Sequence, residues 1–214
     1  KGFKLGDVIG LIGDNKPSWL YFEIAAQAVG GMSLGIYRDT LDEEVGYLIN
    51  AAKVNFVYAE DQEQVDKLLS IKRTKANKIT IFYEDSRGLK ELNDPHIIDM
   101  LDLINEGKAI ANKNPDKYDK LIDKISDEQE AILCTTSGTT SNPKLAMLPG
   151  GKFIEHVVRY LNVDPKSVED EYVSVLPFPW IMEQTYAVGF NIVGGMKVNF
   201  PERSETAMED LREV

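Results

Sequence analysis

Ten consecutive residues, Thr135 to Lys144, carry the side chains best suited to chemistry in this chain. They read Thr-Thr-Ser-Gly-Thr-Thr-Ser-Asn-Pro-Lys and follow an apolar run, Ala131 to Cys134. A strand followed by a turn of small residues can present backbone N–H groups to an anion. The hydroxyl groups add hydrogen-bond donors, and the lysine adds a positive charge. The pattern therefore predicts a polyphosphate-binding loop.

Other interpretations of this segment remain open. An NTPase or kinase-like domain would hold phosphate with a Gly-Lys-Ser/Thr sequence, whereas Pro143 precedes Lys144 here and Leu145 follows it. Nucleotide hydrolysis that does not depend on a carboxylic acid would favour that class. A non-catalytic nucleotide- or acyl-binding module is a further alternative, and an ordinary polar turn is the simplest one.

Composition indicates a globular domain without a nucleic-acid surface. The 214 residues are 43% hydrophobic and 28% charged, enough to bury a core as one domain. A net charge of −11 disfavours general binding to nucleic acid. No apolar run reaches the ~18 residues of a transmembrane segment, which leaves only peripheral membrane contact open, and no signal peptide is visible. The single cysteine, Cys134, fits a reducing compartment, so we expect a buried thiol and a cytoplasmic protein.

Apolar strands alternate with amphipathic helices along most of the chain. Strand–helix–strand repeats of this spacing predict an α/β fold, with mainly parallel sheets and helices on both faces. Residues 86–130 break the rhythm, and we expect a polar helical excursion there, packed on the sheet. The expected strands are 8–13, 32–37, 54–59, 79–83, 131–134, 172–176 and 197–200, and the expected helices are 17–29, 40–52, 62–71, 152–160, 182–193 and 205–213.

Local signals refine the predicted helix starts. Thr40 and Glu43 have the spacing of a capping box, and Asp14 with Asn15 is expected to form the turn that caps the helix from Pro17. Trp19 is expected in the core.

The loop resembles the phosphate loop of the acyl-adenylate-forming enzymes, the superfamily of acyl-CoA synthetases, peptide-synthetase adenylation domains and luciferases. The similarity covers nearly the whole chain, and the tail from Val198 resembles the bacterial long-chain fatty acyl-CoA synthetase branch. It implies that residues 1–214 are the incomplete large N-terminal (AMP-binding) domain, with the C-terminal domain absent. The other segments similar to this superfamily are Gly6 to Asn15, Ala25 to Gly31, Gly35 to Tyr37, Glu43 to Leu48 and Leu176 to Gln184.

The resemblance implies an ATP-dependent fatty acid–CoA ligase. In such an enzyme a carboxylate attacks the α-phosphate of ATP, giving acyl-AMP and pyrophosphate, and the thiol of coenzyme A then attacks the acyl-AMP. Lys144 would offset the phosphate charge, Thr136 would contact Mg²⁺, and both are expected to serve catalysis. We expect the 214-residue chain to be inactive alone. The residues expected to hold the phosphates beside these two are Ser137, Gly138, Thr139, Thr140 and Ser141.

Some positions depart from the superfamily's usual residues. Ser141 and Leu145 stand where glycines are usual, and Trp180 stands where a histidine is usual. The resemblance places Trp180 between nucleotide and acyl pocket, where it could form a wall of the acyl channel; simple core packing is an equal alternative. Glu183 closes the same motif in the first turn of an expected helix, where a carboxylate complements the helix dipole.

Overall fold

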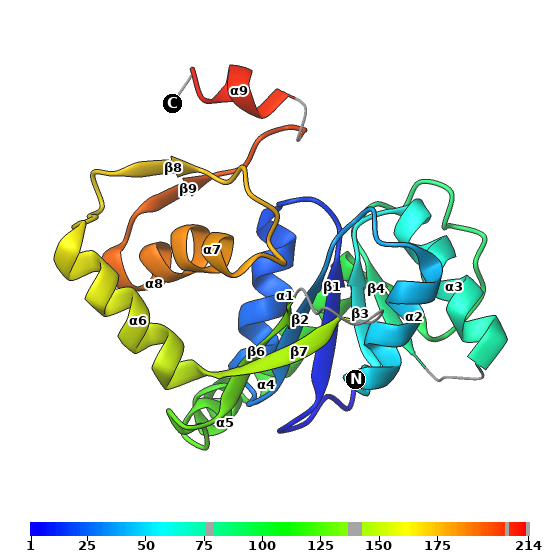
Figure 1. Ribbon diagram of the computed structural model, residues 1–214. Helices are drawn as coiled ribbons and strands as arrows, with labels where there is room; N and C mark the ends of the chain where they lie inside the picture. The colour runs from blue at the N-terminus through cyan, green and yellow to red at the C-terminus, as the bar shows by residue number, and fades with distance from the viewer. Residues whose placement is uncertain (76–78, 137–142, 204–205, 213–214) are drawn as a thin grey trace.

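The core of the protein is one twisted sheet of seven strands, in the order β5-β4-β3-β1-β2-β6-β7 (Figure 1). The computed structural model describes residues 1–75, 79–136, 143–203 and 206–212. Each neighbouring pair is parallel except β6 and β7, which are antiparallel. The predicted α/β fold with a mainly parallel sheet is confirmed. The strands are β1 (Val8–Ile12), β2 (Met32–Ile36), β3 (Phe56–Ala59), β4 (Thr80–Tyr83), β5 (Ile97–Asp99), β6 (Glu130–Thr136) and β7 (Lys144–Pro149).

Helices cover both faces of this sheet because successive strand residues point to opposite sides. Val8 and Ile12 of β1 pack with α2 (Asp42–Ala51) and α3 (Gln62–Lys75) in one buried cluster. Ile9 and Leu11 pack on the other face, against α1 (Pro17–Gln27). Figure 1 shows α2 and α3 on one side of the sheet and α1 on the other.

The helix starts differ from those predicted. Helix α1 begins at Pro17, but Lys16 is its N-cap and no side chain caps it, so the cap expected from Asp14 and Asn15 is wrong. Helix α2 begins at Asp42, and its N-cap is Leu41, also without a side-chain bond. The predicted capping box is therefore wrong, because Thr40 lies one residue too early. Three acidic residues in the first turn of α2 complement its dipole instead.

The segment 86–130 contains a strand that the sequence pattern did not reveal. Strand β5 pairs in parallel with β4 and extends the sheet at that edge. Its last residue, Asp99, accepts a hydrogen bond of 2.8 Å from the backbone of Leu101 and so caps the next helix, α4 (Met100–Lys113). A 3₁₀ turn (Pro115–Lys117) and α5 (Asp119–Ile122) then lead back to β6.

A second layer of structure packs beside β6. Helix α6 (Gly150–Val163) and the helical run Ile181 to Gly194 form a buried cluster with Ile132 and Cys134 of β6. That run consists of α7 (Ile181–Glu183), a π-helical segment (Gln184–Gly189) and α8 (Phe190–Gly194). A parallel pair, β8 (Glu171–Val173) with β9 (Lys197–Asn199), flanks it, and α9 (Ala207–Asp210) follows. None of the helices in the described residues combines the length and the hydrophobicity that a transmembrane segment requires.

Candidate functional site at the carboxyl edge of the sheet

The predicted phosphate loop connects β6 and β7, which form an antiparallel hairpin. Thr136, the last residue of β6, pairs directly with Lys144, the first residue of β7. Residues directly opposite each other in an antiparallel pair project from the same face. Thr136 and Lys144 are both exposed, and the Thr136 hydroxyl is 3.4 Å from the Lys144 carbonyl oxygen. The other predicted phosphate ligands, Ser137, Gly138, Thr139, Thr140 and Ser141, lie outside the described residues.

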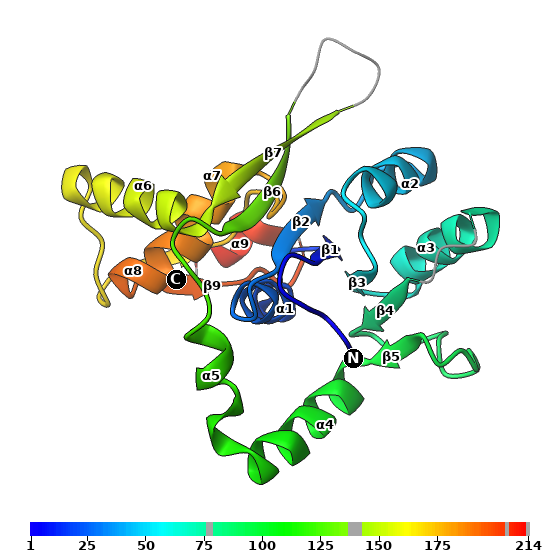
Figure 2. The ribbon, with the colours of Figure 1, turned by 90° about the horizontal axis from the view of Figure 1, so that it is seen from below.

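The hairpin is fixed to the body of the protein along β6 and also beside its loop, where Pro143 directly precedes β7. The Tyr47 hydroxyl of α2 donates a hydrogen bond of 3.2 Å to the Pro143 carbonyl oxygen. Along β6, Leu133 is buried against the α2–α3 side of the sheet, whereas Ile132 and Cys134 are buried against α6. Figure 2 shows the paired strands extending outward beyond β2. The hairpin therefore presents its exposed end from a buried base.

Because β6 runs parallel to β2 and β1, Thr136 lies at the edge where those strands also end. In open α/β sheets, ligands bind outside the carboxyl ends of the strands. A cavity of about 410 Å³ opens at this edge, between the turn after β1, the turn after β2 and a proline-rich segment, Leu176 to Trp180. Its lining includes Asn15, Tyr37, Pro177, Pro179 and Arg203.

Ion pairs join the strand ends beside this cavity. Arg38, which follows β2, pairs with Asp14 after β1 and lies 3.3 Å from Asp61 after β3. Lys16 lies 2.7 Å from the buried carboxylate of Glu60. These contacts hold three strand ends together, and both Arg38 and Lys16 already have acidic partners.

The proline-rich segment carries Trp180 to this edge of the sheet. Trp180 is the N-cap of α7, and 45% of its surface is exposed. The alternative of core packing for Trp180 is therefore wrong. The core aromatic of this segment is Phe178, which is fully buried and stacks on Trp19, with ring centroids 5.5 Å apart. Trp19 is buried as predicted.

The segment lies directly on β2, where a glycine makes room for it. A Cβ atom at Gly35 would lie only 2.7 Å from the Cα atom of Pro179. Real Cβ contacts are essentially never that short, so only glycine allows the two backbones to approach this closely. Gly35 follows Leu34, which pairs with Leu133 of β6. The Trp180 segment therefore packs on the strand next to the hairpin.

Glu183 has a structural position. It lies in the first turn of α7, as predicted, and is fully buried. Its carboxylate accepts hydrogen bonds from the Tyr172 hydroxyl, at 2.6 Å, and from the Ser174 hydroxyl. Burial raises the pKa of Glu183 above the ordinary carboxyl range. Sequence reasoning missed this cluster, because its members meet only through the fold.

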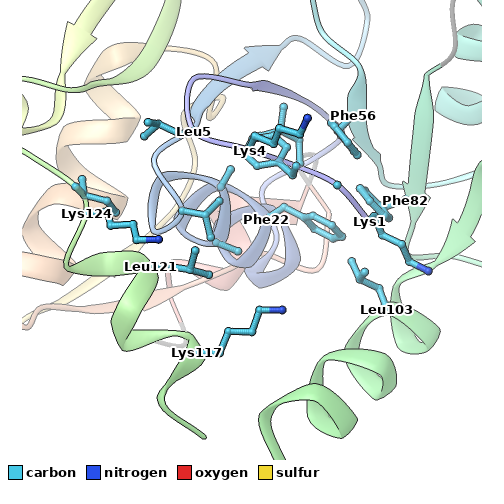
Figure 3. Close-up of a pocket in the computed structure, with 17 residues that line it drawn as sticks. Lys1, Lys4, Leu5, Phe22, Phe56, Phe82, Leu103, Lys117, Leu121 and Lys124 are labelled. Atoms are coloured by element: carbon cyan, nitrogen blue, oxygen red, sulfur yellow. The ribbon is translucent and has the colours of Figure 1, made fainter. Parts of the chain in front are cut away.

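A larger cavity lies at the opposite edge of the sheet (Figure 3). It has a volume of about 680 Å³ and is lined by Ile9 and Phe56, near the starts of their strands, and by Phe22 of α1. Lys117 and Lys124 stand on its other side, from the segment around α5. It is separate from the hairpin, because Thr136 ends a strand that runs parallel to β1.

Neither a metal cluster nor a reactive thiol is found among the described residues. No group of three or more His, Cys, Asp or Glu side chains is placed to hold a metal ion in those parts of the chain. Cys134 is buried as predicted, and burial raises the pKa of its thiol to about 11. A thiol with that pKa is not a nucleophile at neutral pH.

Comparison with known proteins identifies related chains. The family model for AMP-binding enzymes matches residues 1–214. The rat long-chain-fatty-acid–CoA ligase ACSBG1 is 30% identical over 228 aligned residues, which cover all of this chain and 31% of the ligase. The human ACSBG1 is 29% identical, and the alignment covers 100% of this chain and 30% of the human ligase. The chain thus spans about a third of the length of the curated relatives it matches.

Solved structures show the same fold. The anthranilate CoA ligase AuaEII, in complex with anthranoyl-AMP, superposes with a TM-score of 0.75 at 16% identity, covering 98% of this chain and 38% of that one. A putative long-chain-fatty-acid CoA ligase from Rhodopseudomonas palustris gives a TM-score of 0.73 at 11% identity, and the superposition covers 99% of this chain and 49% of that one. At these identities the likeness establishes the architecture.

Proposed function

The chain belongs to the AMP-binding enzyme family, and from this premise we propose that it is part of an ATP-dependent fatty acid–CoA ligase. The observation that carries the proposal is the hairpin, which places Thr136 opposite Lys144 at the carboxyl edge of the sheet. The long-chain ligases among its relatives support the choice of acid. We further propose that residues 1–214 form the incomplete large N-terminal domain, with 86–130 as an excursion within it, of a longer cytoplasmic parent ligase.

In this proposal the hairpin binds the leaving phosphates of ATP. Attack of a carboxylate oxygen on the α-phosphate forms the acyl–phosphate bond and breaks the bond to pyrophosphate. Such a reaction depends on position and on neutralisation of the leaving charge. Lys144 supplies a positive charge, and the segment Ser137 to Ser141 supplies hydroxyl and N–H donors. Lys144 has no ion pair among the contacts of the described residues, so its charge is available for a ligand.

The Thr136 hydroxyl is the group of this hairpin suited to Mg²⁺. Magnesium prefers oxygen ligands and keeps phosphate and water oxygens in its shell. The Thr136 side chain is exposed, and its hydroxyl donates a hydrogen bond of 3.4 Å to the Lys144 carbonyl oxygen, which leaves the lone pairs of the hydroxyl oxygen unused by this bond. A magnesium ion bound there would neutralise phosphate charge.

Trp180 is proposed as the wall of the acyl channel. Trp180 is 45% exposed, and it directly follows Pro179, which lines the cavity at this edge of the sheet. A large indole can contact an acyl chain over much of its face. The thiol of coenzyme A completes the reaction by attacking the acyl-AMP and releasing AMP.

The test is acid-dependent ATP–pyrophosphate exchange by the parent ligase, with palmitate, benzoate and acetate compared at equal concentrations. We expect exchange to be greatest with palmitate. Greater exchange with acetate would refute the long-chain assignment, and ATP hydrolysis without any dependence on acid would refute adenylation. The 214-residue chain alone is expected to make no acyl-CoA, and robust synthesis by it would contradict the proposal that the domain is incomplete.

A further inference from the structure

The segment before Trp180 cannot join a strand ladder. Strand β8 ends at Val173, and Ser174 makes one more backbone bond, donating to the Asn199 carbonyl oxygen at 2.9 Å. Pro177 and Pro179 then have no N–H groups, so a regular ladder is excluded. The remaining polar backbone groups must find other partners, because buried N–H and C=O groups left alone are costly.

Asn15 supplies those partners from the other end of the sequence. Its side-chain amide donates to the Leu176 carbonyl oxygen at 2.6 Å and to the Ser174 hydroxyl at 2.8 Å. Its side-chain oxygen accepts a 3.1 Å bond from the Phe178 N–H. Thus one asparagine, in the turn between β1 and α1, bonds the backbone on both sides of Pro177.

The same bonds act on Trp180 through a short turn. The Trp180 N–H donates to the Pro177 carbonyl oxygen at 2.9 Å, which closes a turn over Phe178 and Pro179. Asn15 bonds Leu176, the residue before this turn, and the N–H of Phe178, the second residue of the turn. The direction in which Trp180 leaves the turn therefore depends on Asn15.

We propose that Asn15 is a positioning residue for Trp180, setting the orientation of the indole in the acyl site. The claim about the acyl site rests on the proposed function, whereas the claim that Asn15 orients the Trp180 indole does not. Asn15→Asp keeps the size of the side chain and its acceptor, but it removes both donors. It also brings a negative charge toward the Leu176 carbonyl oxygen and toward Glu183.

The first test is iodide quenching of tryptophan fluorescence. The chain has two tryptophans; Trp19 is fully buried and shielded, so quenching reports on Trp180. In Asn15→Asp we expect the quenching constant to rise toward about twice its starting value, because a 45% exposed ring gains access as the turn opens. Asn191→Asp is the matched control, since it removes a 2.8 Å bond to the Met196 carbonyl oxygen in another turn, and it should leave quenching unchanged.

Three results would overturn the inference. One is an unchanged quenching constant in folded Asn15→Asp, another is an equal rise in Asn191→Asp, and the third is a rise that persists when Trp180→Phe is added. If Asn15→Asp does not fold, Asn15→Ala decides by the same criteria, because it removes the bonds without adding a charge.

The second test uses the parent ligase and separates this inference from the proposed function. Asn15→Asp should raise the KM for fatty acid roughly 10-fold, the effect of losing about one hydrogen bond, and leave the KM for ATP unchanged. Equal changes in both constants would refute a role in acyl positioning. A parent without acid-dependent exchange would refute the proposed function and leave the quenching result standing.

Discussion

Replacing Glu23 by glutamine should stabilise the protein, and the gain should grow with pH. Glu23 lies in α1 with 1% of its surface exposed. Its partners are neutral: the Ser33 hydroxyl at 2.8 Å and the side-chain amides of Gln184 and Gln27 at 3.2 and 3.4 Å. Within the described residues it forms no ion pair. Burial accordingly raises the pKa of Glu23 in the folded state.

The sign of the effect follows from that shift. A carboxyl group whose pKa is raised by folding favours the folded state only while it is protonated, below its unfolded pKa of ~4.3. As pH rises toward the folded pKa, the wild-type chain loses up to ~1.4 kcal/mol of stability per pH unit from this group. A glutamine cannot ionise, so it avoids the loss. It can also keep two of the three contacts, with its oxygen accepting from the Gln184 amide and its NH₂ group donating to the Ser33 hydroxyl oxygen.

The assay is urea unfolding of Glu23→Gln and the wild type from pH 5.5 to pH 9. We expect the difference in unfolding free energy to increase with pH and to level off above the folded pKa. The control is Glu155→Gln on the surface of α6, where Lys152 and Arg159 lower the pKa of the carboxyl group, so the substitution should not stabilise. A difference for Glu23→Gln that does not change with pH would refute the reasoning.

Two further predictions concern positions near the site, Gly35 and Cys134. Gly35→Ala should destabilise the protein by ~1–3 kcal/mol in urea unfolding, because its Cβ would meet the Pro179 backbone at 2.7 Å. The control is Gly107→Ala, whose new Cβ has nothing within 4 Å, and it should stabilise the protein by ~0.5–1 kcal/mol. If both variants lose a similar amount of unfolding free energy, the close contact at Gly35 is not the cause. Cys134, with a pKa of about 11, should react with iodoacetamide at pH 8 far more slowly in the folded than in the urea-unfolded chain. Equal rates would show that the thiol is accessible.

The sequence was a good guide to the sheet and a poor guide to the contacts at its edge. Strands β1 to β4 are buried on both faces, so each appears as a short apolar run that local pattern detects. Strand β7 was missed because its residues are partly exposed and it pairs with β6 only as a hairpin. Strand β5 has only three residues, too few for a periodic signal.

The errors at the site have one physical cause, which is competition between local and distant partners. Asn15 has the residue type of a local turn former, yet its side chain bonds residues some 160 positions away. Trp180 and Phe178 are both large aromatics in one motif, and only packing decides that Phe178 enters the core. The pairing of Thr136 with Lys144 likewise depends on the hairpin register.

Binding of ATP by the hairpin is the central claim, and Lys144→Ala tests it most directly. A charge-assisted hydrogen bond is worth ~1.5–3 kcal/mol, so we expect roughly 10- to 150-fold weaker use of ATP in pyrophosphate exchange by the parent ligase. The control is Lys113→Ala, which removes an exposed lysine from the end of α4. Both variants should keep the wild-type unfolding free energy within ~0.5 kcal/mol. Exchange by Lys144→Ala within about twofold of the Lys113→Ala control, less than ~0.5 kcal/mol, would contradict the assignment of the hairpin as the phosphate-binding site.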